Sequence, residues 1–152
     1  MRGRGIPPAP RGKAVSVAIV RSLARPLLAS VFVTSGLQTV RHPEALAALA
    51  APVALPIARR VPGLPRDARA LVRLNGAVHL GAGAALACGV LPRVSALVLA
   101  ASLVPTTLAG HAFWKETDPG RRMQHRAAFY GNVSVMGGLL LAAVDRRHRR
   151  RR

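Results

Sequence analysis

The chain contains very little cysteine, and this limits the chemistry open to it. Among its 152 residues there is a single cysteine, Cys88, which lies within an apolar stretch. One thiol excludes a disulfide framework, a Cys-x-x-Cys redox pair and a thiolate metal cluster. Any electron chemistry would therefore depend on a group that the chain does not itself supply.

Catalytic motifs are also lacking. The sequence has no Gly-rich phosphate loop, no His-Glu-x-x-His and no Ser-His-Asp arrangement. An enzyme acting alone would be expected to show such a constellation. Neither His42, His125 nor His148 has a ligand-like partner at i,i+4 spacing, so no metal site is predicted. We therefore assign no catalytic residue and expect no catalysis by the isolated chain.

Acidic residues are scarce: 5 Asp and Glu stand against 23 Lys and Arg, for a formal net charge of +18. In a soluble protein this balance would suggest nucleic-acid binding. Here much of the charge lies in two tails, residues 1–21 and 146–152, and no nucleic-acid recognition fold is visible, so no such partner is expected. We expect a disordered cytoplasmic N-terminal tail and an Arg-rich cytoplasmic C-terminal tail, both binding anionic lipids. An alternative start codon at Val20 would remove most of the first tail.

Long apolar runs, by contrast, are abundant, since 51% of the residues are hydrophobic. The charge-free run from Val94 to Trp114 would form a helix about 30 Å long, which is the thickness of the hydrocarbon core of a bilayer. This run and three others of mainly apolar residues predict four membrane spans, at residues 23–40, 70–91, 93–114 and 123–144. The sequence therefore predicts an all-α polytopic membrane protein, a four-helix bundle formed by residues 22–145.

The connections between the predicted spans follow from their length and their prolines. The apolar segment 45–58 contains Pro52 and Pro56 and is too short to cross, so it predicts an interfacial or re-entrant segment between the first and second spans. Pro26 is expected in the first turn of the first span. The residues Leu91-Pro92-Arg93 predict a tight hairpin between two spans.

Four spans place both termini on the same side of the membrane. The basic tails put that side in the cytoplasm by the positive-inside rule. The abundance of Arg, Ala, Gly and Pro indicates a bacterial genome rich in G and C. We therefore expect a multi-pass protein of the bacterial plasma membrane with both termini in the cytoplasm.

Polar side chains inside a span are costly and usually face other helices. Those predicted to lie in the outer half of the bundle, with a tryptophan at its boundary, are Asn75, His79, Thr106, Thr107, His111, Asn132 and Trp114. Two interpretations stay open. These residues form a polar pocket that binds an amphipathic ligand, or they form hydrogen bonds between helices that hold the bundle together. The tryptophan alone is typical of an interfacial aromatic belt.

Further expectations concern haem and helix packing. Haem binding by His79 and His111 is disfavoured, because these residues are placed roughly 10 Å apart along the membrane normal. The small residues Gly81, Ala85 and Gly89 repeat every four positions and predict close approach of a neighbouring helix.

Two groups of charges are candidates for ion pairs. The mixed-charge loop after Trp114 is either a solvated surface loop or a lid over the polar end. In the second case Glu116 or Asp118 pairs with Arg121, Arg122 or an arginine of the first loop. At the end of the last span, Asp145 is expected to pair with the arginines that directly follow it or to cap the membrane boundary.

Several short motifs together resemble the DoxX family of small bacterial membrane proteins, over about Ser22 to Asp145. The motifs are Asn75-Gly76, Leu91-Pro92-Arg93, Pro105-Thr106-Thr107, His111 with Phe113-Trp114, and Asn132 followed by Gly137-Gly138. The family pattern His-Phe-x-Lys-Asn at the last span reads Ala128-Phe129-Tyr130-Gly131-Asn132 here, without the His and Lys. The resemblance implies a four-helix bundle in the plasma membrane. Some relatives are associated with quinone-linked sulfur oxidation or with membrane complexes that handle oxidative stress.

Two functions follow as hypotheses. The first is a redox-associated accessory subunit that works with redox protein partners and binds a quinone-like molecule through Asn75, His79, His111 and Asn132. The second is a non-catalytic structural or assembly membrane protein. The apolar inner halves of the spans argue against a solute carrier or channel, which would need a continuous polar path.

Overall fold

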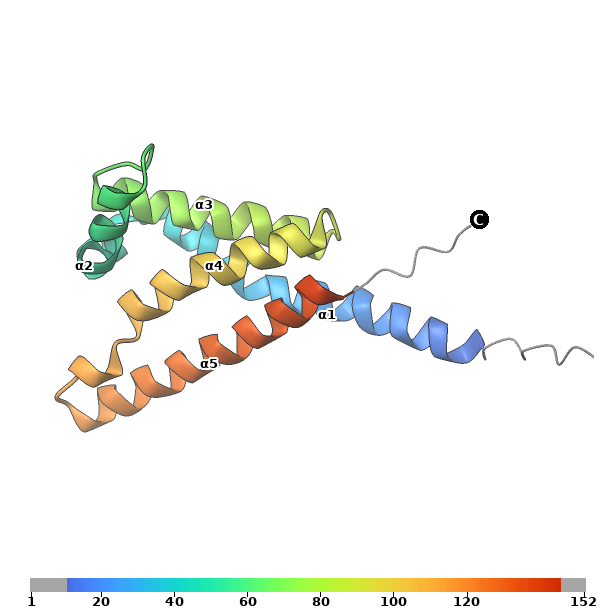
Figure 1. Cartoon of the computed structure of the whole chain (residues 1–152). Helices are drawn as coiled ribbons and strands as arrows, with labels where there is room; N and C mark the ends of the chain where they lie inside the picture. The colour runs from blue at the N-terminus through green and yellow to red at the C-terminus, as the bar shows by residue number, and fades with distance from the viewer. Residues whose placement is uncertain (1–10, 146–152) are drawn as a thin grey trace, which may run out of the picture.

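The computed structural model describes residues 11–145, with side chains from residue 19 onward. This part of the chain is all-α and contains no strand (Figure 1). Its elements are α1 (Arg11–Arg41), α2 (Glu44–Arg60), α3 (Ala68–Ala87), α4 (Pro92–Gly110), the short 3-10 helix η1 (Phe113–Lys115) and α5 (Pro119–Val144). The predicted fold class is confirmed at this level. The tail segments 1–10 and 146–152 lie outside the described residues, and residues 11–21 of the predicted N-terminal tail belong to α1.

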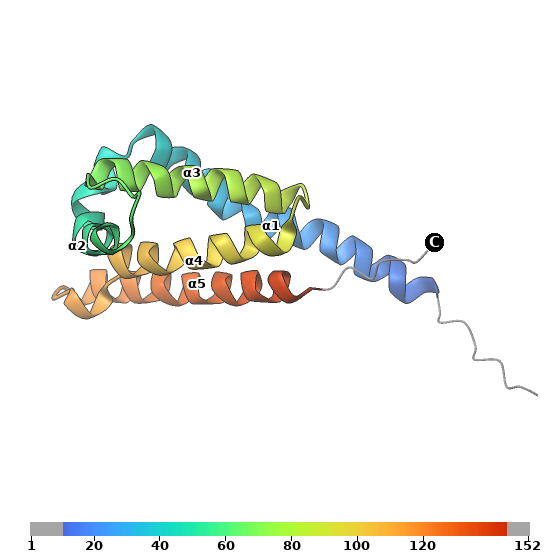
Figure 2. The same ribbon diagram turned by 45° about the horizontal axis from the view of Figure 1, so that its top comes forward.

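The long helices α1, α3, α4 and α5 lie alongside one another. In chain order α1 packs on α3, α3 on α4 and α4 on α5, whereas α1 and α5 contact each other only over a short stretch. Figure 2 shows α2 nearly end-on, so its axis crosses those of the long helices, and it contacts α3 and α4. The core lies between the long helices and contains Phe32, Leu86, Leu99 and Leu139.

The four long helices give the molecule two ends. The η1 end comprises the C-terminal ends of α1 and α4, the helix α2, η1 and the starts of α3 and α5 (Figure 1). The turn end comprises the connection between α3 and α4 and the C-terminal end of α5.

Three segments are long and apolar enough to cross a membrane: Ala68–Ala87, Pro92–Lys115 and Pro119–Val144. They correspond to the predicted second, third and fourth spans. The first predicted span, 23–40, lies within α1, which is not one of these segments, so its crossing stays a prediction. Arg25 and Gln38 both lower the apolar character of α1. Pro26 lies inside α1, so its predicted place in the first turn of a helix is wrong.

The boundaries of α3, α4 and α5 differ from the prediction where local chemistry sets them. The predicted Leu91-Pro92-Arg93 hairpin is wrong in register, since α3 ends at Ala87 and Pro92 begins α4. The turn between them contains Gly89 at φ 69° and Leu91 at φ 42°. α5 begins at Pro119, because the side chain of Asp118 accepts a hydrogen bond from the Arg121 N–H at 2.7 Å.

The contact between α1 and α3 is close enough to require glycine. A Cβ on Gly36 would lie 2.7 Å from the carbonyl oxygen of Gly76, and one on Gly76 would lie 2.9 Å from the Thr39 Cβ. The stripe predicted at Gly81, Ala85 and Gly89 is wrong at Gly81, which has nothing within 4 Å of its Cβ position. The face of α3 that meets α1 instead includes Gly76, His79 and Gly83.

Candidate functional site

Hydrogen bonds between helices occupy four of the predicted ligand-binding residues. The Asn75 side-chain amide on α3 donates to the hydroxyl of Thr106 at 3.1 Å, and that of Asn132 on α5 donates to the hydroxyl of Thr107 at 3.0 Å. Each hydroxyl in turn donates to a carbonyl one turn earlier in α4, at 2.9 Å for Thr106 and 2.7 Å for Thr107. Because consecutive residues of an α-helix point about 100° apart, these two threonines reach different neighbours and tie α4 to α3 and to α5.

This pairing predicts a small, specific contribution to stability. A double-mutant cycle of Asn132→Ala with Thr107→Val should give a coupling free energy of about 0.6 kcal/mol, the mean for hydrogen bonds within a membrane protein. The cycle of Asn132→Ala with Thr106→Val is the matched control and should give additive changes, because Thr106 bonds to Asn75. Unfolding free energies from SDS titration in mild detergent measure both cycles. Equal coupling in the two cycles would contradict the pairing.

His79 and His111 lie in different surroundings. His79 is 5% exposed on α3, and its ring meets the edge of Phe32 from α1 at a centroid distance of 5.2 Å. The ring of His111, at the C-terminal cap of α4, lies 5.8 Å from that of His125 on α5. Within residues 11–145, no group of three or more His, Cys, Asp or Glu side chains is arranged to hold a metal ion.

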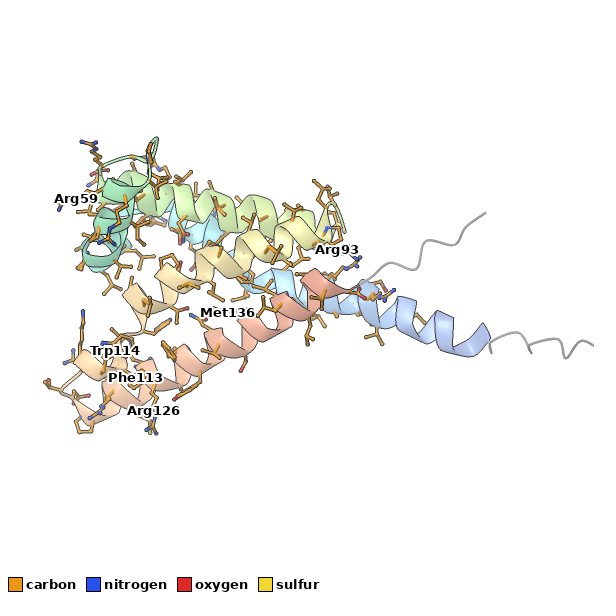
Figure 3. All side chains as sticks on the ribbon, in the orientation of Figure 1. Arg59, Arg93, Phe113, Trp114, Arg126 and Met136 are labelled. Atoms are coloured by element: carbon orange, nitrogen blue, oxygen red, sulfur yellow. The ribbon has the colours of Figure 1, made fainter. Side chains whose placement is uncertain are left out.

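His111 belongs to a cluster at the η1 end that contains most of the aromatic residues of the chain. After Gly110 the chain leaves the α4 axis and forms η1, which places Phe113 and Trp114 against α5 (Figure 3). Phe113 lies 5.5 Å and Trp114 5.9 Å from the ring of Phe129, which also contacts Tyr130 at 5.7 Å. We call this set the His-aromatic cluster; its members are His111, Phe113, Trp114, His125, Phe129 and Tyr130.

The His-aromatic cluster combines an open apolar surface with an unpaired polar atom. Trp114 is 50% and Tyr130 58% exposed, so ring faces are accessible from outside. The Nδ1 atom of His111 is buried without a hydrogen-bond partner among the described residues. A buried polar atom without a partner is costly, and a ligand that bonds to it would remove that cost.

The α5 members of the cluster were not predicted as site residues. His125 and Phe129 are spaced i,i+4 and so share one face of α5, which is a readable signal. Their partners, however, are set by the direction of η1. The chain has only one Trp, one Tyr and three Phe. Four of these five residues are members of the cluster. Their concentration near the end of α4 and the start of α5 is the second sequence feature that could have predicted this site.

The loop between η1 and α5 contains the predicted ion pairs. Arg121 Nε lies 3.3 Å from a carboxylate oxygen of Glu116 and 4.0 Å from one of Asp118, so the pairing with Arg121 is confirmed. Because the Arg121 side chain is 66% exposed, water screens these pairs and their contribution to stability is small. The loop lies beside the His-aromatic cluster, and its role as a lid stays a prediction.

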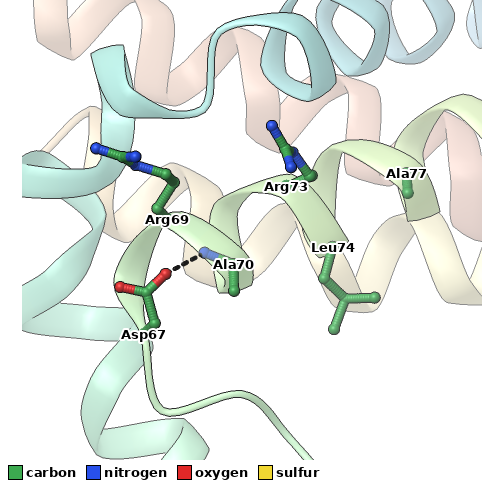
Figure 4. A pocket seen from close by; sticks show the side chains of 6 residues that line it. All are labelled: Asp67, Arg69, Ala70, Arg73, Leu74 and Ala77. Carbon is green, nitrogen blue, oxygen red and sulfur yellow. Dashed lines mark hydrogen bonds between the residues drawn. The ribbon is translucent and has the colours of Figure 1, made fainter.

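Two surface cavities lie at the η1 end, and none of the predicted ligand-binding residues lines either of them. One, of about 380 Å³, is at the start of α3 (Figure 4); its lining residues are Asp67, Arg69, Ala70, Arg73, Leu74 and Ala77. The carboxylate there accepts a hydrogen bond from the Ala70 N–H at 2.8 Å and so caps α3. The other, of about 370 Å³, is lined by Leu55, Arg59 and Arg66. The open ring faces of the His-aromatic cluster belong to neither cavity.

Comparison with known proteins gives a family match. The sequence model of the DoxX family matches residues 20–112, which is more than half of the chain and extends from within α1 to Ala112, just after α4. No curated protein matches the chain. No solved structure matches it either. Of the His-aromatic cluster, only His111 lies within the matched residues. The cluster members in η1 and α5 lie outside them.

Proposed function

Because the chain belongs to the DoxX family of integral membrane proteins, we propose that it binds a quinone-like molecule at the His-aromatic cluster. It acts there as a redox-associated accessory subunit, with the electron chemistry performed by partner subunits. The proposal differs from the one based on sequence alone, since Asn75 and Asn132 already donate to threonine hydroxyls. Among the predicted ligand-binding residues, His111 and Trp114 remain as direct contacts, and His79 serves packing between α1 and α3.

The observation that best supports this site is the unpaired His111 Nδ1 beside a concentration of aromatic rings. A quinone has a flat ring that stacks on aromatic faces and carbonyl oxygens that accept hydrogen bonds. An imidazole N–H of His111 would donate to such a carbonyl. The site also lies where the apolar segment Pro92–Lys115 ends, which suits a molecule with a polar head and an apolar tail.

The proposed topology has four spans, formed by α1, α3, α4 and α5, in the bacterial plasma membrane. The close glycine contact between α1 and α3 supports a place for α1 within the bilayer. The proline-containing helix α2 lies across the η1 end and is proposed to rest in the membrane interface. The basic tails favour a cytoplasmic turn end, which puts the His-aromatic cluster on the outer side.

The second candidate function is non-catalytic assembly of a membrane complex. It is favoured by the Asn–Thr hydrogen bonds, which hold helices together and leave these residues little capacity for a ligand. It is also favoured by the apolar surface of α5, where Val133, Leu140 and Leu141 are exposed. Such a surface contacts either lipid or the helices of a partner subunit.

The chain's single tryptophan offers a direct test, because Trp114 lies within the proposed site. A short-chain benzoquinone titrated into the full-length protein in mild detergent should quench Trp114 fluorescence with a saturable curve. His111→Ala should weaken binding about tenfold to thirtyfold, the effect of losing one hydrogen bond to a buried group. Extraction of the untreated protein should also yield a stoichiometric quinone by mass spectrometry.

The matched control is His42→Ala, which removes an exposed histidine that pairs with Glu44 at 3.7 Å and does not belong to the cluster. This variant should bind the benzoquinone as the original protein does. Non-saturable quenching, or equal binding by both variants, would reject the ligand site. If His111→Ala lowers stability and no quinone binds, the assembly function is the better account.

A further inference from the structure

Three arginines from two helices meet Asp145 at the turn end. Arg21 and Arg25 on α1 approach its carboxylate at 2.6 and 3.5 Å. Arg93, which lies at the start of α4 (Figure 3), donates a hydrogen bond to the backbone carbonyl of Asp145 at 3.4 Å. The arginines predicted to pair with Asp145 lie outside the described residues. The observed contacts join the start of α4 and the end of α5 to α1.

The charges in this cluster do not balance. The side chains of Arg25 and Asp145 are only 15% and 25% exposed, so their charges are partly removed from water. The other four acidic residues of the chain all belong to the η1 end; they are Glu44, Asp67, Glu116 and Asp118. The Asp145 carboxylate lies closest to Arg21, and Arg25 shares the same carboxylate at a longer distance. Among the described residues, neither Arg25 nor Arg93 therefore has an acidic partner of its own. Arg93 is exposed, whereas Arg25 is largely buried. Excess positive charge is stabilised by a bound anion, and most strongly where it is partly buried, as at Arg25.

The surface around the arginines is apolar. Leu23 and Leu27 on α1 are 58% and 73% exposed, and Leu141 and Val144 on α5 are 71% and 70% exposed. Two of the apolar segments that can cross a membrane begin or end here, at Pro92 and at Val144. Positive groups at the end of a membrane span, with apolar surface next to them, match the charged head and the acyl chains of a phospholipid.

We propose that Arg25 and Arg93, with Arg21, bind the phosphate of an anionic phospholipid at the turn end. Guanidinium groups bind phosphate oxygens through paired hydrogen bonds, so several can share one phosphate. The acyl chains lie along the exposed apolar side chains of α1 and α5. The lipid neutralises the charge that Asp145 leaves unbalanced and bridges helices that otherwise contact each other over a short stretch.

Native mass spectrometry of the full-length protein in nonionic detergent tests this site. The first phosphatidylglycerol should bind at least tenfold more tightly than the first phosphatidylcholine, because only the former has net negative charge. The double variant Arg25→Gln/Arg93→Gln should weaken that first phosphatidylglycerol about thirtyfold, at about fivefold per basic residue near a membrane surface. Equal affinity for both lipids, or an unchanged affinity in the double variant, would overturn the proposal.

The matched control is Arg59→Gln/Arg66→Gln, which removes two exposed arginines that line a cavity at the η1 end. This variant should bind the first phosphatidylglycerol within threefold of the original protein. An equal loss of affinity in both double variants would mean that binding depends on the net charge of the protein and not on this site, and would overturn the proposal. If Arg25→Gln/Arg93→Gln does not yield folded protein, Arg93→Gln alone, which loses only a contact to a backbone carbonyl, should weaken binding about fivefold. No loss in that variant would likewise reject the site.

Inorganic phosphate separates a lipid from a free anion. Millimolar phosphate should leave the first phosphatidylglycerol bound, because it supplies the charge but no acyl chain. Displacement of the lipid by phosphate at an equal concentration would overturn the assignment to a lipid.

Discussion

Replacing Gly36 with alanine should lower the free energy of unfolding by about 3 kcal/mol, the upper part of the range for overpacking a protein interior. The new Cβ would lie 2.7 Å from both the Gly76 carbonyl oxygen and the Leu80 backbone nitrogen. Both are backbone atoms of α3, so the clash can be relieved only by moving one helix away from the other. That movement would also loosen the contact of Phe32 with His79 nearby.

A control at Gly81 isolates the clash from the general effect of alanine in a helix. Gly81 lies on α3 with nothing within 4 Å of its Cβ position, so Gly81→Ala should be neutral or stabilise by up to about 1 kcal/mol. SDS titration of both variants in mild detergent gives the comparison. A cost below about 1 kcal/mol for Gly36→Ala would mean that α1 does not pack on α3 as closely as the structure shows.

The contrast between these glycines also explains what the sequence could predict about the fold. Apolar runs of about 20 residues correctly predict where α3, α4 and α5 lie, because crossing length is a property of composition. The face that each helix presents to its neighbour depends on rotation about its own axis. Spacing alone favoured Gly81, whereas α3 uses Gly76 and Gly83, seven positions apart, against α1.

The predicted site shows the same limit. Asn75, Thr106, Thr107 and Asn132 were correctly expected to face other helices, and depth in the membrane could be estimated from position in each span. Whether polar groups at one depth bond to each other or stay free for a ligand depends on distances of a few ångströms, here 3.1 and 3.0 Å for the two pairs.

Contacts between distant parts of the chain were the least predictable. Asp145 pairs with Arg21, 124 positions away, a partner that its sequence neighbourhood does not indicate; the pairing expected with the arginines that follow it stays a prediction. The aromatic members of α5 were missed for a similar reason. The turn after Gly110 directs Phe113 and Trp114 towards Phe129, and no periodic pattern in the sequence encodes that direction.

Truncating Phe32 to alanine should cost about 3 kcal/mol, at the lower end of the range for a buried phenylalanine. Phe32 is 2% exposed and its Cβ lies 3.2 Å from the Cβ position of Gly83, so the remaining cavity would be bounded by closely packed backbone. The cost is at the lower end because, when membrane helices separate, an exposed phenylalanine is still surrounded by apolar lipid. The loss is therefore mainly one of packing contacts between α1 and α3.

The matched control for this truncation is Leu27→Ala on the same helix. Leu27 is 73% exposed, so its removal should change the unfolding free energy by less than about 0.5 kcal/mol. The comparison also bears on the proposed first span, since α1 is not among the segments apolar enough to cross by composition. Its place in the membrane then depends on packing against α3 through Phe32 and Gly36. If Phe32→Ala costs no more than Leu27→Ala, α1 lacks that anchor and the four-span topology loses its main support.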